Sequence, residues 1–153
     1  MIFIDTDVLW LAFAFHQDAR QAANNAFLEQ VQTERPATTI YNVLELLGKL
    51  SFNLSSDRLD EWRTWLVDAY HLRVIWPMNP SLTTAAPTFQ NEIFERPYQK
   101  MRTVQMPFMD SLILNLAERT PNAAQFVTWN ARHFQGKSAL QVLTPEEYVQ
   151  IKA

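Results

Sequence analysis

Three acidic residues that lie far apart in the chain occupy positions from which their carboxylates could share one site. Asp5 ends a short apolar run, Glu45 lies within a helical pattern, and Asp110 lies in the first turn of another helical pattern. Two carboxylates about 4 Å apart repel each other by roughly 4 kcal/mol at an effective dielectric of 20, so their convergence requires a proton or a cation. Carboxylate oxygens suit Mg²⁺ or Mn²⁺, which can activate water to hydrolyse a phosphodiester.

Two of these acids also have ordinary structural explanations. Asp5 follows a predicted strand and could simply cap the next helix, although Asp7 is the better candidate for that cap. Asp110 follows Pro107 in a first helical turn, where a carboxylate interacts favourably with the helix dipole. Neither position by itself establishes a catalytic role.

Glu45 is more informative because of its neighbours on the helix surface. It points about 140° away from the predicted apolar stripe, at 100° per residue. Its neighbours are Tyr41, Gly48, Lys49 and Phe52, so we expect a partly buried glutamate. Gly48 weakens the helix by about 1 kcal/mol relative to alanine, which suggests close approach by another element. The predicted inward stripe consists of Ile40, Val43, Leu44 and Leu47.

Short apolar runs alternate with helical patterns, which predicts an α/β fold with a parallel sheet covered on both faces. The predicted strands are residues 2–5, 36–39, 72–76, 125–128 and 140–143. The predicted helices are residues 7–15, 18–32, 40–52, 57–70 and 108–119, with a last one opening at Thr144-Pro145. Between residues 77 and 106 we expect one or two helices, a possible start at 79–81, and an irregular loop near 96–106 that follows from Pro87 and Pro97.

The strand ends indicate where these elements place a site. In parallel sheets, ligands bind at the carboxyl ends of the strands. Asp5 closes the first predicted strand, and Thr128 closes the fourth and is followed by Asn130. We therefore expect Asp5, Thr128 and the helix that carries Glu45 to converge at one edge.

Composition limits the remaining possibilities. The chain has 153 residues with 48% hydrophobic and 19% charged residues, which predicts one globular domain spanning 1–153. It contains no cysteine, which excludes thiol chemistry, and its two glycines exclude a glycine-rich phosphate loop. The net charge is −3, which counts against a simple DNA-binding module. With no apolar stretch near 18 residues and no signal-peptide pattern, we expect a cytoplasmic protein without membrane association.

Four segments in order along the chain resemble the motifs of PIN-domain proteins, and among these the VapC-like toxins. Each motif is weak alone, but their order and spacing span residues 3 to 150 and are fairly specific. The segments are Phe-Ile-Asp-Thr-Asp-Val-Leu (3–9), Tyr-Asn-Val-Leu-Glu-Leu (41–46), Met-Asp-Ser-Leu-Ile-Leu-Asn-Leu-Ala (109–117) and Val-Thr-Trp-Asn-Ala-Arg-His-Phe (127–134).

The resemblance implies a three-layer α/β/α sandwich with a central parallel sheet of about five strands. It implies a Mg²⁺- or Mn²⁺-dependent endoribonuclease, a cognate antitoxin partner and a homodimer. By the same resemblance, Asp5 and Asp110 would bind the metal, Glu45 would complete the acidic cluster, and Thr128 and Asn130 would position water or the acidic side chains.

One residue departs from the family pattern. His133 stands where the family often has aspartate, which removes one anionic ligand and puts a second metal ion in doubt. Asp7 stands where asparagine is frequent and could add to metal binding.

Basic residues suggest where RNA could reach the acidic edge. Phosphate contacts are predicted for Arg96, Lys100, Arg102 and Arg132, although a solvated charged face would explain them equally well. The tryptophans at positions 10, 62, 65 and 76 fit core positions rather than base-stacking platforms.

Other functions remain open at this point. The chain could be a catalytically degenerate PIN-like binding module, although the retained acids argue against it. It could be a free-standing RNA-processing enzyme, a metal-dependent phosphatase or a DNA nuclease, but it is short for a flap-processing enzyme. A receiver-like signalling domain would require a lysine after a late strand, for which Lys137 is poorly placed.

Overall fold

The computed structural model describes residues 1–15, 17–77 and 85–152, and within them a five-stranded sheet is entirely parallel. The strands are β1 (Ile2–Ile4), β2 (Ala37–Thr39), β3 (Arg73–Ile75), β4 (Gln125–Val127) and β5 (Gln141–Leu143). All five predicted strands are confirmed, each one or two residues shorter than expected. The order β3-β2-β1-β4-β5 places the topological switch between β1 and β4, where parallel sheets commonly bind ligands.

Most predicted helices are also confirmed, with shifts of a few residues at their ends. They are α1 (Thr6–Ala14), α2 (Gln21–Val31), α3 (Ile40–Leu50), α4 (Ser56–Ala69), α7 (Phe108–Arg119) and α9 (Pro145–Lys152). A 3₁₀ turn, Gln32–Glu34, follows α2, and the short helix α8 (Ala131–Phe134) follows β4. The start of α9 forms a capping box, in which Thr144 and Glu147 each accept a hydrogen bond from the other's backbone N–H.

The irregular loop predicted near residues 96–106 is wrong. The helix α5 (Ala85–Gln90), a π-helical turn (Asn91–Glu95) and the helix α6 (Arg96–Val104) follow one another directly. Pro87 lies in the first turn of α5, where its missing N–H is tolerated. Pro97 follows the π turn, whose wider ring of hydrogen bonds accommodates the proline. The predicted helix start at 79–81 lies outside the described residues.

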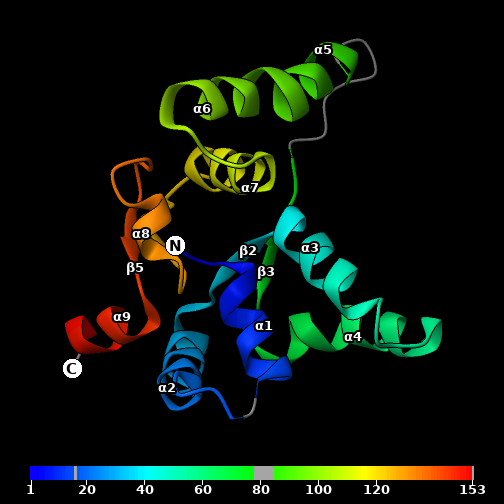
Figure 1. Ribbon diagram of the computed structural model, residues 1–153, viewed down its shortest axis with the longest axis vertical. Coiled ribbons are helices and arrows are strands. Elements are labelled where there is room, and N and C mark those ends of the chain that lie inside the picture. The colour runs from blue at the N-terminus through cyan, green and yellow to red at the C-terminus, as the bar shows by residue number, and fades with distance from the viewer. Residues whose placement is uncertain (16, 78–84, 153) are drawn as a thin grey trace.

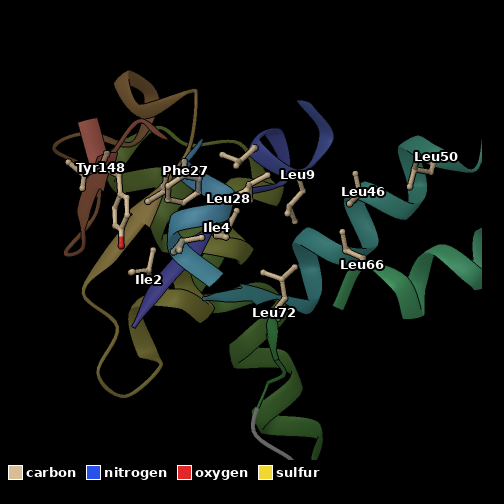
Figure 2. Packing of buried hydrophobic residues seen from close by; sticks show 14 residues of the cluster. Ile2, Ile4, Leu9, Phe27, Leu28, Leu46, Leu50, Leu66, Leu72 and Tyr148 are labelled. Atoms are coloured by element: carbon tan, nitrogen blue, oxygen red, sulfur yellow. The ribbon is translucent and has the colours of Figure 1, made fainter. Parts of the chain in front are cut away.

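The helices cover both faces of the sheet, as predicted for a three-layer α/β/α fold (Figure 1). Alternate residues of β1 point to opposite faces, as the pleat of a strand requires. Ile2 and Ile4 join a core with α1, α2, α3, α4 and α9 (Figure 2), whereas Phe3 joins a second core with α7 and α8. The helix α6 packs on the outside of α7. No helix among the described residues is long and apolar enough to cross a bilayer.

The tryptophans are divided between core and surface. Trp10 and Trp62 pack against the first core, as expected. Trp65 and Trp76 are 47% and 65% exposed, so the prediction of core positions is wrong for them. Trp76 follows β3, which is the edge strand of the sheet that the described residues form.

Candidate active site

Asp5 stands at the centre of the candidate site, at the carboxyl end of β1. It is the N-cap of α1, and its Oδ1 accepts a hydrogen bond from the Thr6 backbone N–H at 2.7 Å. The prediction that Asp7 would be the cap is therefore wrong. Asp5 is only 7% exposed. Burial raises the pKa of its carboxyl well above the usual range, and the charges of Asp7 and Asp110 raise it further.

Asn42 joins Asp5 to the start of α3 and was not found from the sequence. Its buried amide donates from Nδ2 to Asp5 Oδ1 at 2.9 Å and to Thr6 Oγ1 at 3.1 Å. Its Oδ1 accepts from the backbone N–H and the hydroxyl of Thr39, which is the N-cap of α3. The one available signal was the spacing Thr39-x-x-Asn42 before an apolar pattern, which is typical of a capping box.

Glu45 reaches the same edge from the next turn of α3. Its Oε2 accepts a hydrogen bond from the Thr6 hydroxyl at 2.6 Å, and its Oε1 pairs with Lys49 at 3.0 Å. The side chain is 28% exposed, which confirms the predicted partial burial. The prediction that another element approaches Gly48 closely is wrong, however, because nothing lies within 4 Å of the place a Cβ would occupy.

The inward face of α3 differs from the predicted stripe. Leu44 is 57% exposed, whereas Val43, Leu46 and Leu50 are buried. This rotation of the helix turns Asn42 into the interior and leaves Glu45 at the edge of the site.

Asp7 ties α1 to the turn after β4. Its Oδ2 accepts hydrogen bonds from the Thr128 hydroxyl at 2.9 Å and from the Asn130 backbone N–H at 3.0 Å, and its Oδ1 accepts from the Trp129 backbone N–H at 3.2 Å. Burial raises the pKa of Asp7, while these donors act in the opposite direction. The acidic side chain held by Thr128 and Asn130 is therefore that of Asp7, and the donors are the Thr128 hydroxyl and the Asn130 backbone N–H.

Asp110 faces this group from the first turn of α7. Its side chain is 27% exposed, and its Oδ2 lies 3.2 Å from Nε2 of His133 on α8, close enough for an ion pair but not aligned as a hydrogen bond. Burial raises the pKa of Asp110; His133 opposes this, and the charges of Glu45 and Asp7 add to it. Asp110 and the other acids thus influence one another electrostatically.

The acids provide oxygen ligands of the type that a hard divalent cation prefers. Among the described residues, no three His, Asp or Glu side chains stand close enough together to form a complete metal-binding group. Mg²⁺ is usually held by one or two carboxylates and several waters. One or two of the carboxylates of Asp5, Asp110 and Glu45, with water as the remaining ligands, could hold such an ion.

The basic residues predicted to contact RNA have different surroundings. Lys100 pairs with Glu118 of α7 at 2.7 Å and is mostly buried. Arg96 lines a cavity beside Glu92 and Arg119. Arg102 in the last turn of α6 and Arg132 on α8 are exposed.

No protein-family model matches the chain, and no curated protein matches it as a relative. The function of the site is therefore inferred from its geometry and from the motifs in the sequence.

Proposed function

We propose that this protein is a metal-dependent endoribonuclease of the PIN-domain type, with Asp5, Glu45 and Asp110 as its acidic centre. The gathering of carboxylates at the carboxyl edge of the parallel sheet carries this proposal, because the pKa is raised in three of them, Asp5, Asp7 and Asp110. Like charges in poorly solvated positions destabilise a fold, and such arrangements occur preferentially at functional sites. A bound divalent cation would relieve that repulsion.

Metal binding and the orientation of the carboxylates would be carried out by different residues. Mg²⁺ or Mn²⁺, when bound, would supply an activated water and neutralise charge on the phosphoryl group. Asp5 and Asp110 would hold the ion, with Glu45 completing the acidic set. Asn42 orients the Asp5 carboxylate and Thr6 orients the Glu45 carboxylate through the hydrogen bonds that they donate.

The turn after β4 supports the same site from the other side of β1. Thr128 fixes Asp7, and the exposed Asn130 would position water or RNA at this edge. Arg102 and Arg132 would contact RNA phosphates. The resemblance to VapC-like toxins extends the proposal to a cognate antitoxin, a homodimer and a cytoplasmic location.

Cleavage of a mixed single-stranded RNA pool by the purified protein tests the proposal. The reactions contain Mg²⁺, Mn²⁺ or EDTA, and compare the wild type with Asp5→Asn. We expect cutting that requires the metal and falls in the variant by more than the roughly 10- to 100-fold loss typical of an outer-sphere metal partner. Asp60→Asn, the same change at an exposed position of α4, is the matched control and should cut as the wild type does.

Two outcomes would overturn the proposal. If folded wild-type protein cuts no RNA with either metal, the result contradicts a general endoribonuclease and favours a binding module or an enzyme with a very narrow substrate. If Asp5→Asn cuts as well as Asp60→Asn, the activity resides elsewhere or comes from a contaminating nuclease.

A further inference from the structure

Four exposed aromatic side chains come from one stretch of the chain, between the start of α5 and the start of α7. Phe89, Phe94, Tyr98 and Phe108 are 67%, 58%, 43% and 44% exposed. None of them belongs to either hydrophobic core formed by the described residues. Large aromatic surface left in water without a packing role is typical of a binding surface.

Two of these rings form a flat platform. Phe94 and Tyr98 stand on successive turns with ring centroids 5.7 Å apart and planes inclined by only 2°. Every other aromatic pair found among the described residues is T-shaped or tilted. Two parallel rings leave flat outer faces on which a further planar group can stack.

The π-helical turn before α6 contributes to this arrangement. In it the Arg96 backbone N–H donates to the carbonyl of Asn91, five residues earlier. In an α-helix, residues five apart point about 140° apart. The wider π turn over Asn91–Glu95 changes that offset between Phe89 and Phe94. Turns of this kind often occur at functional sites.

The charge of α6 differs from that of the whole molecule. The nine residues Arg96–Val104 include three basic and no acidic side chains, whereas the chain has a net charge of −3. At 100° per residue, Arg102 lies about 40° from Tyr98 around the helix, and Lys100 lies about 160° away. Accordingly, Lys100 pairs with α7, and Arg102 extends the aromatic face with a positive charge.

We propose that Phe94, Tyr98 and Arg102, called here the α6 stripe, bind single-stranded RNA on its way to the acidic edge. Unpaired bases would stack on the two rings, and the Arg102 guanidinium would pair with a phosphate. Arg102 lies in the last turn of α6, and Asp110 lies in the first turn of α7, the next helix along the chain. This inference rests on the proposed ribonuclease function.

The observations favour RNA over a protein partner. The parallel rings of Phe94 and Tyr98 match the bases of a single strand, and Arg102 matches its phosphates, although the exposed Glu95 next to Phe94 adds one negative charge. Stacking accepts any base sequence. A random-sequence oligonucleotide is therefore an adequate probe.

Fluorescence anisotropy of a labelled random-sequence single-stranded RNA, in EDTA to prevent cutting, measures the binding. We expect Phe94→Ala and Tyr98→Ala each to weaken binding by about 5-fold or more, and the double variant by more. Tyr98→Trp, which keeps a flat ring, should bind as well as the wild type. Phe52→Ala removes an aromatic side chain that is 89% exposed in the turn after α3, and as the matched control it should have no effect.

Other results would overturn the inference. It fails if the folded double variant binds RNA with wild-type affinity, or if the wild type binds no single-stranded RNA. It also fails if the double variant changes only the oligomeric state measured by light scattering, which would make the stripe a protein interface. The cleavage assay tests the other proposal separately. If RNA binding depends on the stripe but no RNA is cut, only the proposed nuclease activity is contradicted. If RNA is cut but its binding does not depend on the stripe, only the proposed role of the stripe is contradicted.

Discussion

At the scale of single residues, Asn42 connects the fold to the site. Its amide oxygen completes the cap of α3 with Thr39, and its amide nitrogen donates to Asp5. The amide has no exposed surface, so each of these hydrogen bonds replaces a bond to water. One side chain therefore sets the start of a helix and the direction of a carboxylate at the same time.

Asn42→Ala should lower the free energy of unfolding by about 2–4 kcal/mol. It removes a capping interaction worth about 1 kcal/mol and leaves buried partners without a donor, at about 1–3 kcal/mol. It should also reduce RNA cleavage, because Asp5 loses its orientation. Urea denaturation and the cleavage assay measure the two effects.

Asn53→Ala changes the same residue type at an exposed position after α3 and is the matched control. If Asn42→Ala is no less stable than this control, the hydrogen bonds assigned to the amide do not stabilise the fold.

At the scale of elements, the turn between β4 and α8 depends on a contact with α1. Asp7 on α1 accepts a hydrogen bond from the Thr128 hydroxyl and from two backbone N–H groups in the turn. The turn therefore lies at the edge of the site because an acid from a different element holds it there.

Thr128→Val keeps the shape of the side chain and removes the donor. A hydrogen bond to a charged group contributes about 1.5–3 kcal/mol, so we expect a loss of that order in the free energy of unfolding. Because the hydroxyl lowers the pKa of Asp7, that pKa should rise in the variant. Urea denaturation measures the stability, and NMR titration of the carboxyl carbon measures the pKa.

Thr128→Ser keeps the hydroxyl and should retain most of the stability and the pKa of Asp7. Equal losses in the serine and valine variants would show that packing of the methyl group, and not the hydrogen bond, stabilises the turn.

At the scale of the whole molecule, the fold places several carboxylates where burial makes their charged form unfavourable. Asp5, Asp7 and Asp110 all have a raised pKa, with burial as the first cause. Between the ordinary carboxyl pKa near 3.9 and the raised values, the folded protein holds protons that the unfolded chain has lost. The contribution of these groups to the free energy of unfolding therefore falls as pH rises through that window, and remains low above it.

We expect two consequences for Asp5→Asn, whose side chain carries no charge at any of these pH values and can still cap α1. The difference in free energy of unfolding between this variant and the wild type should favour the variant more at about pH 7.5 than at about pH 5. Mg²⁺ at neutral pH should stabilise the wild type, by about 2.7 kcal/mol at 100 times its dissociation constant, and the variant much less. Urea denaturation at both pH values, with Mg²⁺ and with EDTA, measures both.

The comparison with Asp60→Asn removes the effect of carboxylates elsewhere, such as Asp18, whose pKa is lowered to about 2 by Arg20. If Asp5→Asn and Asp60→Asn show the same pH dependence and the same response to Mg²⁺, burial of the Asp5 charge does not oppose folding.

The five strands, most of the helices and the edge of the sheet that carries the acids could be predicted from the amino-acid pattern alone. These features follow from local rules, because the spacing of apolar residues reports strands and helices, and parallel strands carry their carboxyl ends to one edge. Asp5 and Thr128 could be selected in this way, whereas Glu45 and Asp110 were selected from their positions on helices and from the resemblance to PIN-domain motifs.

The groups that hold those acids depend instead on how distant elements pack against one another. Asn42 reaches Asp5 across 37 residues, and Thr128 reaches Asp7 across 121. The rotation that exposes Leu44 and the helix that continues through Pro97 likewise depend on neighbouring elements. Hydrogen bonds and burial between distant parts of the chain have no periodic signal in the sequence, so they are set when the elements pack together.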